Sequence, residues 1–309
     1  MLIPLLMAGC SKGIDPEEQL VEIKLNAGNA ATKAPIASYG QTSFSPTVAG
    51  WEVLTGETVN YTLSEKWVTT TSSIAYNAVN APITLTTPQN YAKDKRYLTY
   101  IKSWYPAGNP AGGIVTFSAP MTDGSQDILY SQPPQFDDRY PVEVSGSKFD
   151  VITTPVEYWH PLSQFKVVAY KPAGIADEVK VLSIKLKGSE IATGIDLDND
   201  ELITVPKDVY LFNDPGTPTE LTNTSKAVGD PVMVKPFDSN IIYFEVVTNQ
   251  YTDQNVKVTL DVKPDDPAGY PCMPGRAYTI TLKVNTEEIT VVGAKIISWK
   301  EGETGSGEL

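Results

Sequence analysis

Two stretches near the end of the chain, Val256-Lys-Val-Thr-Leu-Asp-Val262 and Tyr278-Thr-Ile-Thr-Leu-Lys-Val284, decide the fold class. In each stretch apolar residues alternate with polar ones, and this period of two gives a β-strand one apolar face. Between them lies Pro264–Gly275, a segment so rich in proline and glycine that it predicts a long connection. We therefore expect the two stretches to pair as an antiparallel ribbon.

Similar short stretches recur along the whole chain, separated by turn residues. They predict strands at Val21–Leu25, Val59–Leu63, Ile83–Thr86, Tyr97–Trp104, Ile114–Ser118, Phe165–Ala169, Val179–Leu186, Ile241–Val247 and Ile289–Trp299. No segment shows convincing amphipathic helical periodicity, and the strands do not alternate with helices as they do in parallel-sheet enzymes. The sequence therefore predicts an all-β protein built from antiparallel, immunoglobulin-like β-sandwiches.

The length of 309 residues suits two such domains, because a domain usually contains about 100–200 residues. The best candidate for a boundary is Lys171-Pro-Ala-Gly-Ile-Ala-Asp-Glu178, where a Pro-Gly turn and an acidic pair separate two strand-like stretches. We place the boundary near residue 176. The predicted domains are an N-terminal sandwich at 11–176 and a C-terminal sandwich at 177–309, which ends in a flexible acidic tail.

The composition excludes several classes of function. The chain has 24 Lys and Arg against 37 Asp and Glu, a net charge of −13, so we expect no nucleic-acid partner. One histidine, His160, and two cysteines, Cys10 and Cys272, are too few for a zinc cluster or a disulfide framework. We expect no cofactor and no metal, a structural His160, and a Cys272 that acts as a small buried apolar side chain.

One acidic stretch, Asp196-Leu-Asp-Asn-Asp-Glu201, places oxygen atoms at alternate positions, as a calcium loop does. It fails the EF-hand pattern, because Glu201 stands where glycine is needed and Lys207 stands where the bidentate glutamate is needed. A solvated turn between strands is the better interpretation, and calcium is the alternative. The acidic pairs at 137–138 and 265–266 lie in proline-rich segments, and no nucleophile or phosphate-loop motif occurs. We therefore do not expect an enzyme.

An aromatic pair, Trp104-Tyr105, precedes the glycine-rich stretch Gly108–Gly113. On an exposed loop these two side chains would form a platform for a sugar ring. Packing at the end of a strand is the other interpretation. If the first holds, the protein is a glycan-binding lipoprotein of the outer surface.

The N-terminus, Met1–Gly9, is apolar and ends in Met7-Ala8-Gly9-Cys10, which resembles a bacterial lipobox. The resemblance implies that residues 1–10 contain the lipoprotein signal and that Cys10 is diacylated, which anchors the protein to a membrane. The segment has no Lys or Arg before its apolar run, and it is shorter than the usual signal peptide of about 15–30 residues. We therefore expect that the natural start lies further upstream.

Four features, taken in order, resemble the fimbrillin family, the lipoprotein precursors of type V pili in anaerobic gut and oral bacteria. After the lipobox and the first strand, Ala31-Thr-Lys-Ala34 stands where the family commonly has Thr-Arg-Ala. The other features are Trp104-Tyr-Pro-Ala-Gly108 with Gln126-Asp-Ile-Leu-Tyr130, then Trp159-His-Pro-Leu-Ser-Gln-Phe165, and finally Arg276-Ala-Tyr-Thr-Ile-Thr-Leu282 with Ile296-Ile-Ser-Trp299. The resemblance spans nearly the whole chain.

The resemblance implies two tandem transthyretin-like sandwiches on the outer membrane or in a fimbrium at the cell surface. It also implies that a Lys/Arg-directed protease cuts between Lys33 and Ala34 and removes the lipid with the first strand. That strand would carry Val21, Ile23 and Leu25 inward. A strand from another pilus subunit would then fill the groove. The other implied partner is a host or bacterial surface receptor.

Two departures from the family pattern affect the expected role. Lys33 stands where the family more often has arginine, so cleavage depends on the protease available. After Trp299 only a tail rich in glycine and glutamate follows, without alternating apolar residues. Either Ile289–Trp299 acts as the donor strand or this chain donates none. We therefore favour a tip or accessory role over that of a main shaft subunit.

Overall fold

The computed structural model describes residues 19–30, 43–75, 79–118, 122–132, 143–260, 272–286 and 288–298, and its regular secondary structure there is all β. The strands of the first half are β1 (Leu25–Ala30), β2 (Ser43–Phe44), β3 (Thr47–Leu54), β4 (Trp67–Thr70), β5 (Ile74–Ala75), β6 (Val79–Ile83), β7 (Tyr97–Tyr105), β8 (Gly108–Ala111), β9 (Ile114–Phe117), β10 (Leu129–Tyr130), β11 (Val144–Gly146) and β12 (Val156–Tyr158).

The second half continues the all-β pattern. Its strands are β13 (Ser163–Tyr170), β14 (Lys180–Lys187), β15 (Glu190–Asp196), β16 (Glu201–Pro206), β17 (Val209–Asn213), β18 (Thr219–Glu220), β19 (Lys226–Ala227), β20 (Val232–Val234), β21 (Ile241–Thr248), β22 (Thr252–Thr259), β23 (Arg276–Val284) and β24 (Ile289–Ser298). Within the described ranges, no helix is long and apolar enough to cross a membrane.

The N-terminal half packs two sheets against each other. One sheet has the order β12-β1-β6, and the other has the order β10-β7-β3-β4, with β11 also paired to β7. Apolar side chains from both sheets meet in one buried cluster, which includes Leu25, Ile101 and Val156. Hydrophobic burial of these alternating side chains drives the packing.

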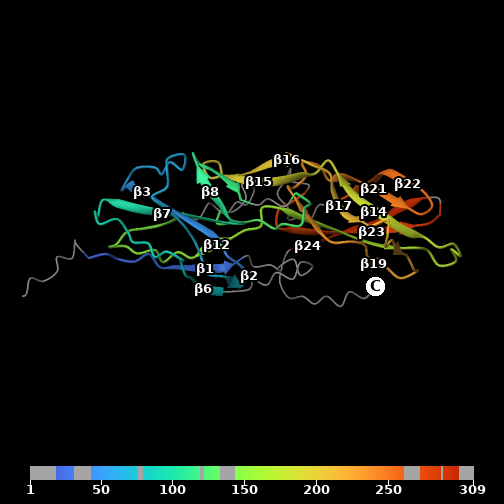
Figure 1. The fold of residues 1–309 in the computed structure, drawn as a ribbon, viewed down its shortest axis with the longest axis horizontal. Coiled ribbons are helices and arrows are strands. Elements are labelled where there is room, and N and C mark those ends of the chain that lie inside the picture. Colours follow the sequence, from blue (N-terminus) through green and yellow to red (C-terminus); the bar gives the residue numbers. More distant parts are fainter. Residues whose placement is uncertain are drawn as a thin grey trace, which may run out of the picture.

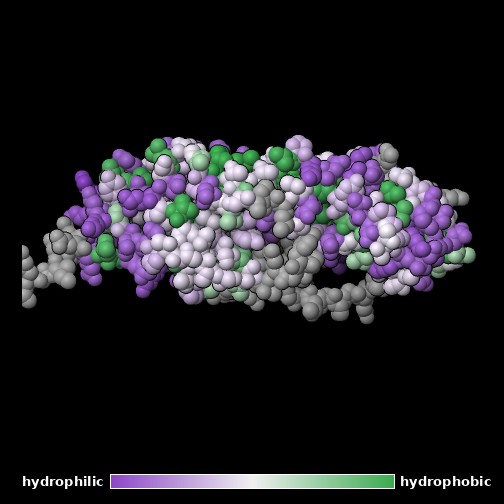
Figure 2. Space-filling model, in the orientation of Figure 1, coloured by the Kyte–Doolittle hydropathy of each residue, from purple (hydrophilic) through white to green (hydrophobic). Residues whose placement is uncertain are grey.

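The C-terminal half repeats this arrangement at the other end of an elongated molecule (Figure 1). Its sheets have the orders β17-β14-β21-β22 and β19-β13-β23-β24, with β18 added to β14 and β20 added to β13. Phe165, Ile184, Phe244 and Ile280 are fully buried between them. The face shown in Figure 2 is mostly hydrophilic, with apolar residues scattered over both halves. The predicted all-β sandwich class is confirmed.

The ribbon expected from Val256–Val262 and Tyr278–Val284 is wrong. The first stretch lies largely in β22, which pairs with β21, whereas the second lies in β23, which pairs with β13 and β24. Both strands bury alternate apolar side chains in the same core, but from opposite sheets. Alternation fixes which face of a strand is buried, and it does not fix which strand lies beside it.

The sheets are also not purely antiparallel, because β13 pairs with β23 in parallel and β1 pairs with β12 in parallel. Most predicted strands are confirmed, namely those now seen as β7, β9, β13, β14, β21 and β24. The strand predicted over Val59–Leu63 is wrong. Asn60 accepts a hydrogen bond from the Thr62 backbone N–H at 2.9 Å, which makes a turn there.

The predicted boundary near residue 176 falls between β13 and β14, and these two strands belong to the same buried cluster. The C-terminal core therefore begins before this position, at β13. The hairpin of β15 and β16 joins β9 and β8 of the first half in one four-stranded sheet. A third buried cluster, which includes Trp104, Leu162 and Ile195, packs where the two halves meet. A turn signal in the sequence marks a chain reversal as readily as a domain boundary.

The pairing of β15 with β9 supplies a test of this junction. A Cβ atom at Gly194 would lie 2.2 Å from the carbonyl oxygen of Val115, so backbone atoms of β9 would have to move. We expect Gly194→Ala to lower the free energy of unfolding by about 1–3 kcal/mol.

The matched control is Gly293→Ala in β24, where an added Cβ meets no atom within 4 Å. Chemical denaturation of both variants checks the prediction. Equal stability of the two variants would contradict it.

Candidate functional site

The segment around β1 alternates between buried and exposed side chains. Ile23, Leu25 and Ala27 are buried in the N-terminal core, whereas Glu22, Lys24 and Asn26 are exposed. Val21 is half-buried and packs against the same cluster. The predicted inward direction of Val21, Ile23 and Leu25 therefore agrees with the structure. Regular strand geometry begins only at Leu25, and the residues before it run in extended form beside Gln89–Tyr91.

This strand is the middle strand of its sheet, with β12 on one side and β6 on the other (Figure 1). It is antiparallel to β6, with Leu25 opposite Ile83, and parallel to β12, with Ala27 opposite Val156. Upstream, the Ile23 N–H donates to the Gln89 carbonyl oxygen at 2.8 Å. Removal of the segment would therefore expose two strand edges at once, with an apolar floor between them.

The positions that the segment fills differ in size. Ile23 and Leu25 are large side chains, whereas the fully buried Ala27 is small. On the outer face of β1, a Cβ at Gly28 would lie 3.0 Å from the Glu157 side chain and 3.2 Å from that of Pro155. The groove beneath β1 thus accepts two large apolar side chains at alternate positions, followed by a small one. The outer face of β1 is tightly packed at Gly28.

Three predicted positions, namely Cys10, Lys33 and Ala34, lie outside the described residues. In the sequence, Lys33 follows shortly after Ala30, the last residue of β1. The acidic pairs at 137–138 and 265–266 and the C-terminal tail also lie outside the described part of the chain.

Of the two interpretations of Trp104 and Tyr105, the aromatic platform is wrong for Trp104. Its side chain is fully buried in the third cluster, and its indole Nε1 donates to the Gly108 carbonyl oxygen at 3.1 Å. Tyr105 is half-buried and packs edge-on against Phe44. Packing at the end of the strand is the correct interpretation, because a buried indole offers no face to a sugar.

His160 and Cys272 are both buried. His160 lies against Asp127, with 2.9 Å between Nδ1 and Oδ2, which fits the predicted structural role. Cys272 belongs to the C-terminal core, and burial raises the pKa of its thiol. A thiol with a raised pKa is a poor nucleophile, so the prediction of a small buried side chain is confirmed.

The acidic stretch Asp196–Glu201 forms the turn between β15 and β16. Asp196 Oδ1 accepts hydrogen bonds from the backbone N–H groups of Asp198 and Asn199, at 2.9 and 3.1 Å. Asp200 instead points to Lys102 of β7, with 2.5 Å between Nζ and Oδ1. Among the described residues no group of three or more His, Cys, Asp or Glu side chains is arranged to hold a metal ion.

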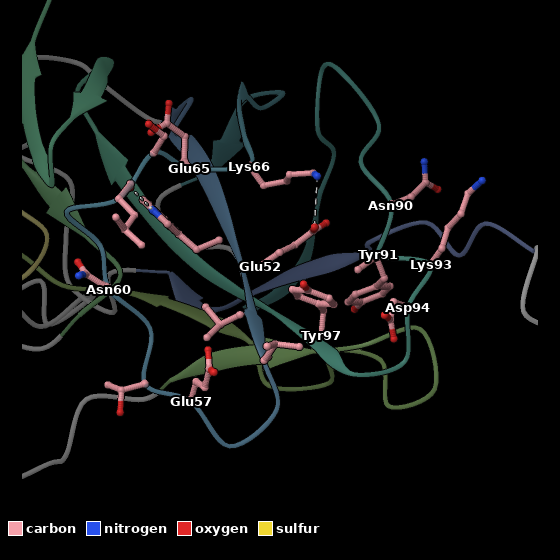
Figure 3. Close-up of a pocket in the computed structure, with 17 residues that line it drawn as sticks. Glu52, Glu57, Asn60, Glu65, Lys66, Asn90, Tyr91, Lys93, Asp94 and Tyr97 are labelled. Atoms are coloured by element: carbon pink, nitrogen blue, oxygen red, sulfur yellow. Dashed lines mark hydrogen bonds and ion pairs between the residues drawn. The ribbon is translucent and has the colours of Figure 1, made fainter.

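A cavity of about 940 Å³ lies between the loop after β3 and the segment before β7 (Figure 3). Its walls combine carboxylates, amides, amines and aromatic rings, among them Glu57, Asn60, Lys93 and Tyr97. This volume is at the upper end of the range of ligand pockets, about 300–1,000 Å³. No sequence pattern indicates this cavity, because its two walls are about 35 residues apart in the chain and meet only through the pairing of β3 with β7.

Compared by sequence, the chain matches no protein-family model and no curated protein. Compared by structure, it is similar to a proposed cell adhesion protein from Bacteroides uniformis, with 14% identity, a TM-score of 0.52, and coverage of 93% of this chain and 100% of that one. The chain has the fold of this Bacteroides protein.

Similar structures also include a fimbrial protein from Bacteroides vulgatus, with 13% identity, a TM-score of 0.45, and coverage of 90% and 99% of the two chains. Another is the tip fimbrial protein Mfa3 from Porphyromonas gingivalis, solved with a C-terminal truncation, with 12% identity, a TM-score of 0.43, and coverage of 91% and 100%.

The space beneath β1 at Ala27 can be tested by substitution. Because Ala27 is fully buried, we expect Ala27→Leu to overpack the core and to lower the free energy of unfolding by about 1–3 kcal/mol. Asn26→Leu is the matched control, since Asn26 is exposed on the opposite face, and it should change stability by about 0.5 kcal/mol or less. Thermal denaturation of the two variants distinguishes them, and a neutral Ala27→Leu would show a roomier groove.

Proposed function

We propose that this chain is a structural and adhesive component of a pilus at the bacterial cell surface, assembled by exchange of the β1 strand. The observation that carries the proposal is the position of β1 between β12 and β6, with a lysine shortly after its end in the sequence. The fold shared with a proposed cell adhesion protein supports it, and so do the names of the fimbrial neighbours.

In this proposal the precursor is a lipoprotein, held in the outer membrane by lipid on Cys10. Cleavage between Lys33 and Ala34 separates the lipid and β1 from the rest of the chain. The loss exposes apolar surface previously covered by Ile23 and Leu25, each worth about 1.5–3 kcal/mol when buried. It also leaves unpaired backbone groups on two strands, so a donor strand from another subunit binds favourably.

A second copy of this chain carries a segment with the required pattern at the edge of a sheet. In β24, Ile289, Val291 and Gly293 stand at alternate positions and repeat the large, large, small order of Ile23, Leu25 and Ala27. In the described structure β24 pairs only with β23, at the end of its sheet. If β24 does not leave its sheet, the chain accepts a strand without giving one, as we propose for a tip or accessory subunit.

Limited digestion of the full chain with trypsin tests processing and assembly together. We expect a new N-terminus at Ala34, read by mass spectrometry, because Lys33 follows the last residue of β1, Ala30, in the sequence. A ladder of heat-labile oligomers on an unboiled denaturing gel would identify a polymerising subunit, and cleavage without a ladder would identify a tip or accessory subunit.

The control for this digestion is Lys33→Gln, which should keep its N-terminal segment and stay monomeric under the same conditions. Protection of Lys33 in the natural chain, while both halves stay folded, would contradict removal of β1 and make it a permanent part of the sandwich.

A second candidate function, binding of surface glycans by a lipoprotein, is favoured by the cavity between the β3 and β7 loops. Its lining of carboxylates, amides and tyrosines supplies hydrogen bonds and apolar ring faces, which is the chemistry that binds sugars. Several of its carboxylates, including Glu57 and Glu65, favour neutral oligosaccharides over sialylated ones by charge.

A glycan array of neutral and sialylated oligosaccharides tests this candidate on the monomer. We expect Tyr97→Ala to weaken any neutral-glycan binding by about tenfold or more, because Tyr97 lines the cavity (Figure 3). Tyr243→Ala is the matched control, since Tyr243 is exposed on the C-terminal sheet. Binding that survives Tyr97→Ala, or no binding by the natural chain, would contradict a glycan site in this cavity.

A further inference from the structure

Lys102 is a buried amine in the middle of β7. Only 2% of its side chain is exposed, and Ile101 and Ser103 on either side are buried as well. An ammonium group withdrawn from water is costly unless partners surround it. The burial of Lys102 therefore needs a reason, because neither the proposed strand exchange nor the proposed glycan site uses this residue.

The partners of Lys102 come from the turn between β15 and β16 and from two aromatic rings. Nζ lies 2.5 Å from Asp200 Oδ1 and also donates to the Leu197 carbonyl oxygen. The Tyr61 ring faces the amine, with 3.8 Å from Nζ to its centroid. The phenol of Tyr130 donates a hydrogen bond to the same Asp200 oxygen, so an amine and a phenol converge on one carboxyl group.

The electrostatics of this site favour the neutral amine more than water does. Burial lowers the pKa of Lys102, and this effect outweighs the opposing attraction of Asp200 and the other carboxylates of the turn. Burial also raises the pKa of Tyr130 well above its ordinary value, so its phenol keeps its proton and remains a donor. The carboxyl oxygen that accepts both hydrogen bonds is thereby polarised.

We propose that Lys102 and Asp200 condense to an intramolecular amide, a covalent cross-link between β7 and the β15–β16 turn. One ammonium proton passes from Nζ to Asp200 Oδ1, and the freed lone pair attacks Asp200 Cγ to form the C–N bond. A second proton passes from nitrogen to Oδ1, the C–Oδ1 bond breaks, and Oδ1 leaves as water. The nitrogen keeps its third proton, the opposite charges cancel, and no oxidant, reductant or co-reactant is needed.

The surroundings suit each step of this condensation. The hydrogen bond that Tyr130 donates to Oδ1 assists the departure of this oxygen as water when the C–Oδ1 bond breaks. Asp200 is 22% exposed, so the released water has a path to solvent on the carboxylate side, whereas the amine side is closed. Lys102 and Asp200 are held in place by the β7 sheet and by the tight turn, which lowers the entropic cost of bringing them together.

The cross-link would join residues that are 98 positions apart in the chain. Like a disulfide that closes a long loop, it would restrict the unfolded chain and so stabilise the fold. It would also tie the N-terminal sheet to the hairpin that joins the two halves. A subunit of a surface fibre under tension would gain resistance to unfolding, although the cross-link itself does not depend on the proposed strand exchange.

The intact mass of the purified full chain tests the proposal. We expect a mass lower than that of the sequence by one water, and a proteolytic digest that contains Lys102 and Asp200 in one branched peptide, identified by tandem mass spectrometry. The full sequence mass, with Lys102 and Asp200 recovered in separate linear peptides, would overturn it and leave a buried ion pair. This measurement uses only the natural chain, so it does not depend on whether a variant folds.

Two variants and an internal control sharpen the result. Lys102→Arg keeps a positive charge but lacks the amine, so it should have its full sequence mass. Tyr130→Phe keeps the ring but loses the donor, and we expect a smaller cross-linked fraction in it. The pair of Lys185 and Glu245, 3.0 Å apart on the C-terminal sheet, should stay unlinked, because both side chains are partly exposed. A branched peptide at that pair as well would point to dehydration during handling and contradict a built site.

Discussion

The hydrogen bonding of β1 to strands on both of its sides is the constraint on which the N-terminal half depends. Without β1, strands β12 and β6 have no common neighbour in their sheet, and the buried cluster loses Ile23, Leu25 and Ala27 from its floor. In the proposed assembly, in which the bond after Lys33 is cut, this middle strand is both a structural necessity and a removable part. That combination is what makes the exchange of one strand for another energetically reasonable.

The two halves are joined by more than the chain that connects them. The hairpin β15–β16 crosses to β9, the third cluster packs around Trp104 and Ile195, and the Lys102–Asp200 pair fixes the hairpin turn to β7. These contacts lie at the junction of the halves, away from the groove beneath β1. In the proposed exchange, the junction can therefore stay intact while β1 leaves, as a fibre subunit that transmits force would need.

The sequence predicted much of the candidate site and missed the rest for physical reasons. The inward set of the first strand was readable, because burial on one face imposes a period of two. For Trp104 the sequence left two interpretations open, an exposed platform and packing at the end of a strand, because an aromatic residue beside a proline and glycines has the same pattern in both. The cavity lined by Glu57 and Tyr97 and the partnership of Lys102 with Asp200 gave no local signal, because their residues meet only through long-range strand pairing.

The sequence by itself determined the all-β class, the buried face of each main strand and the inert burial of Cys272, because these follow from local alternation and polarity. Only the tertiary structure decided that β22 and β23 lie in opposite sheets, that β13 pairs with β23 in parallel, and that the C-terminal core begins before residue 176. Side-chain alternation specifies a face, whereas the neighbour of a strand is chosen by the packing of the whole domain.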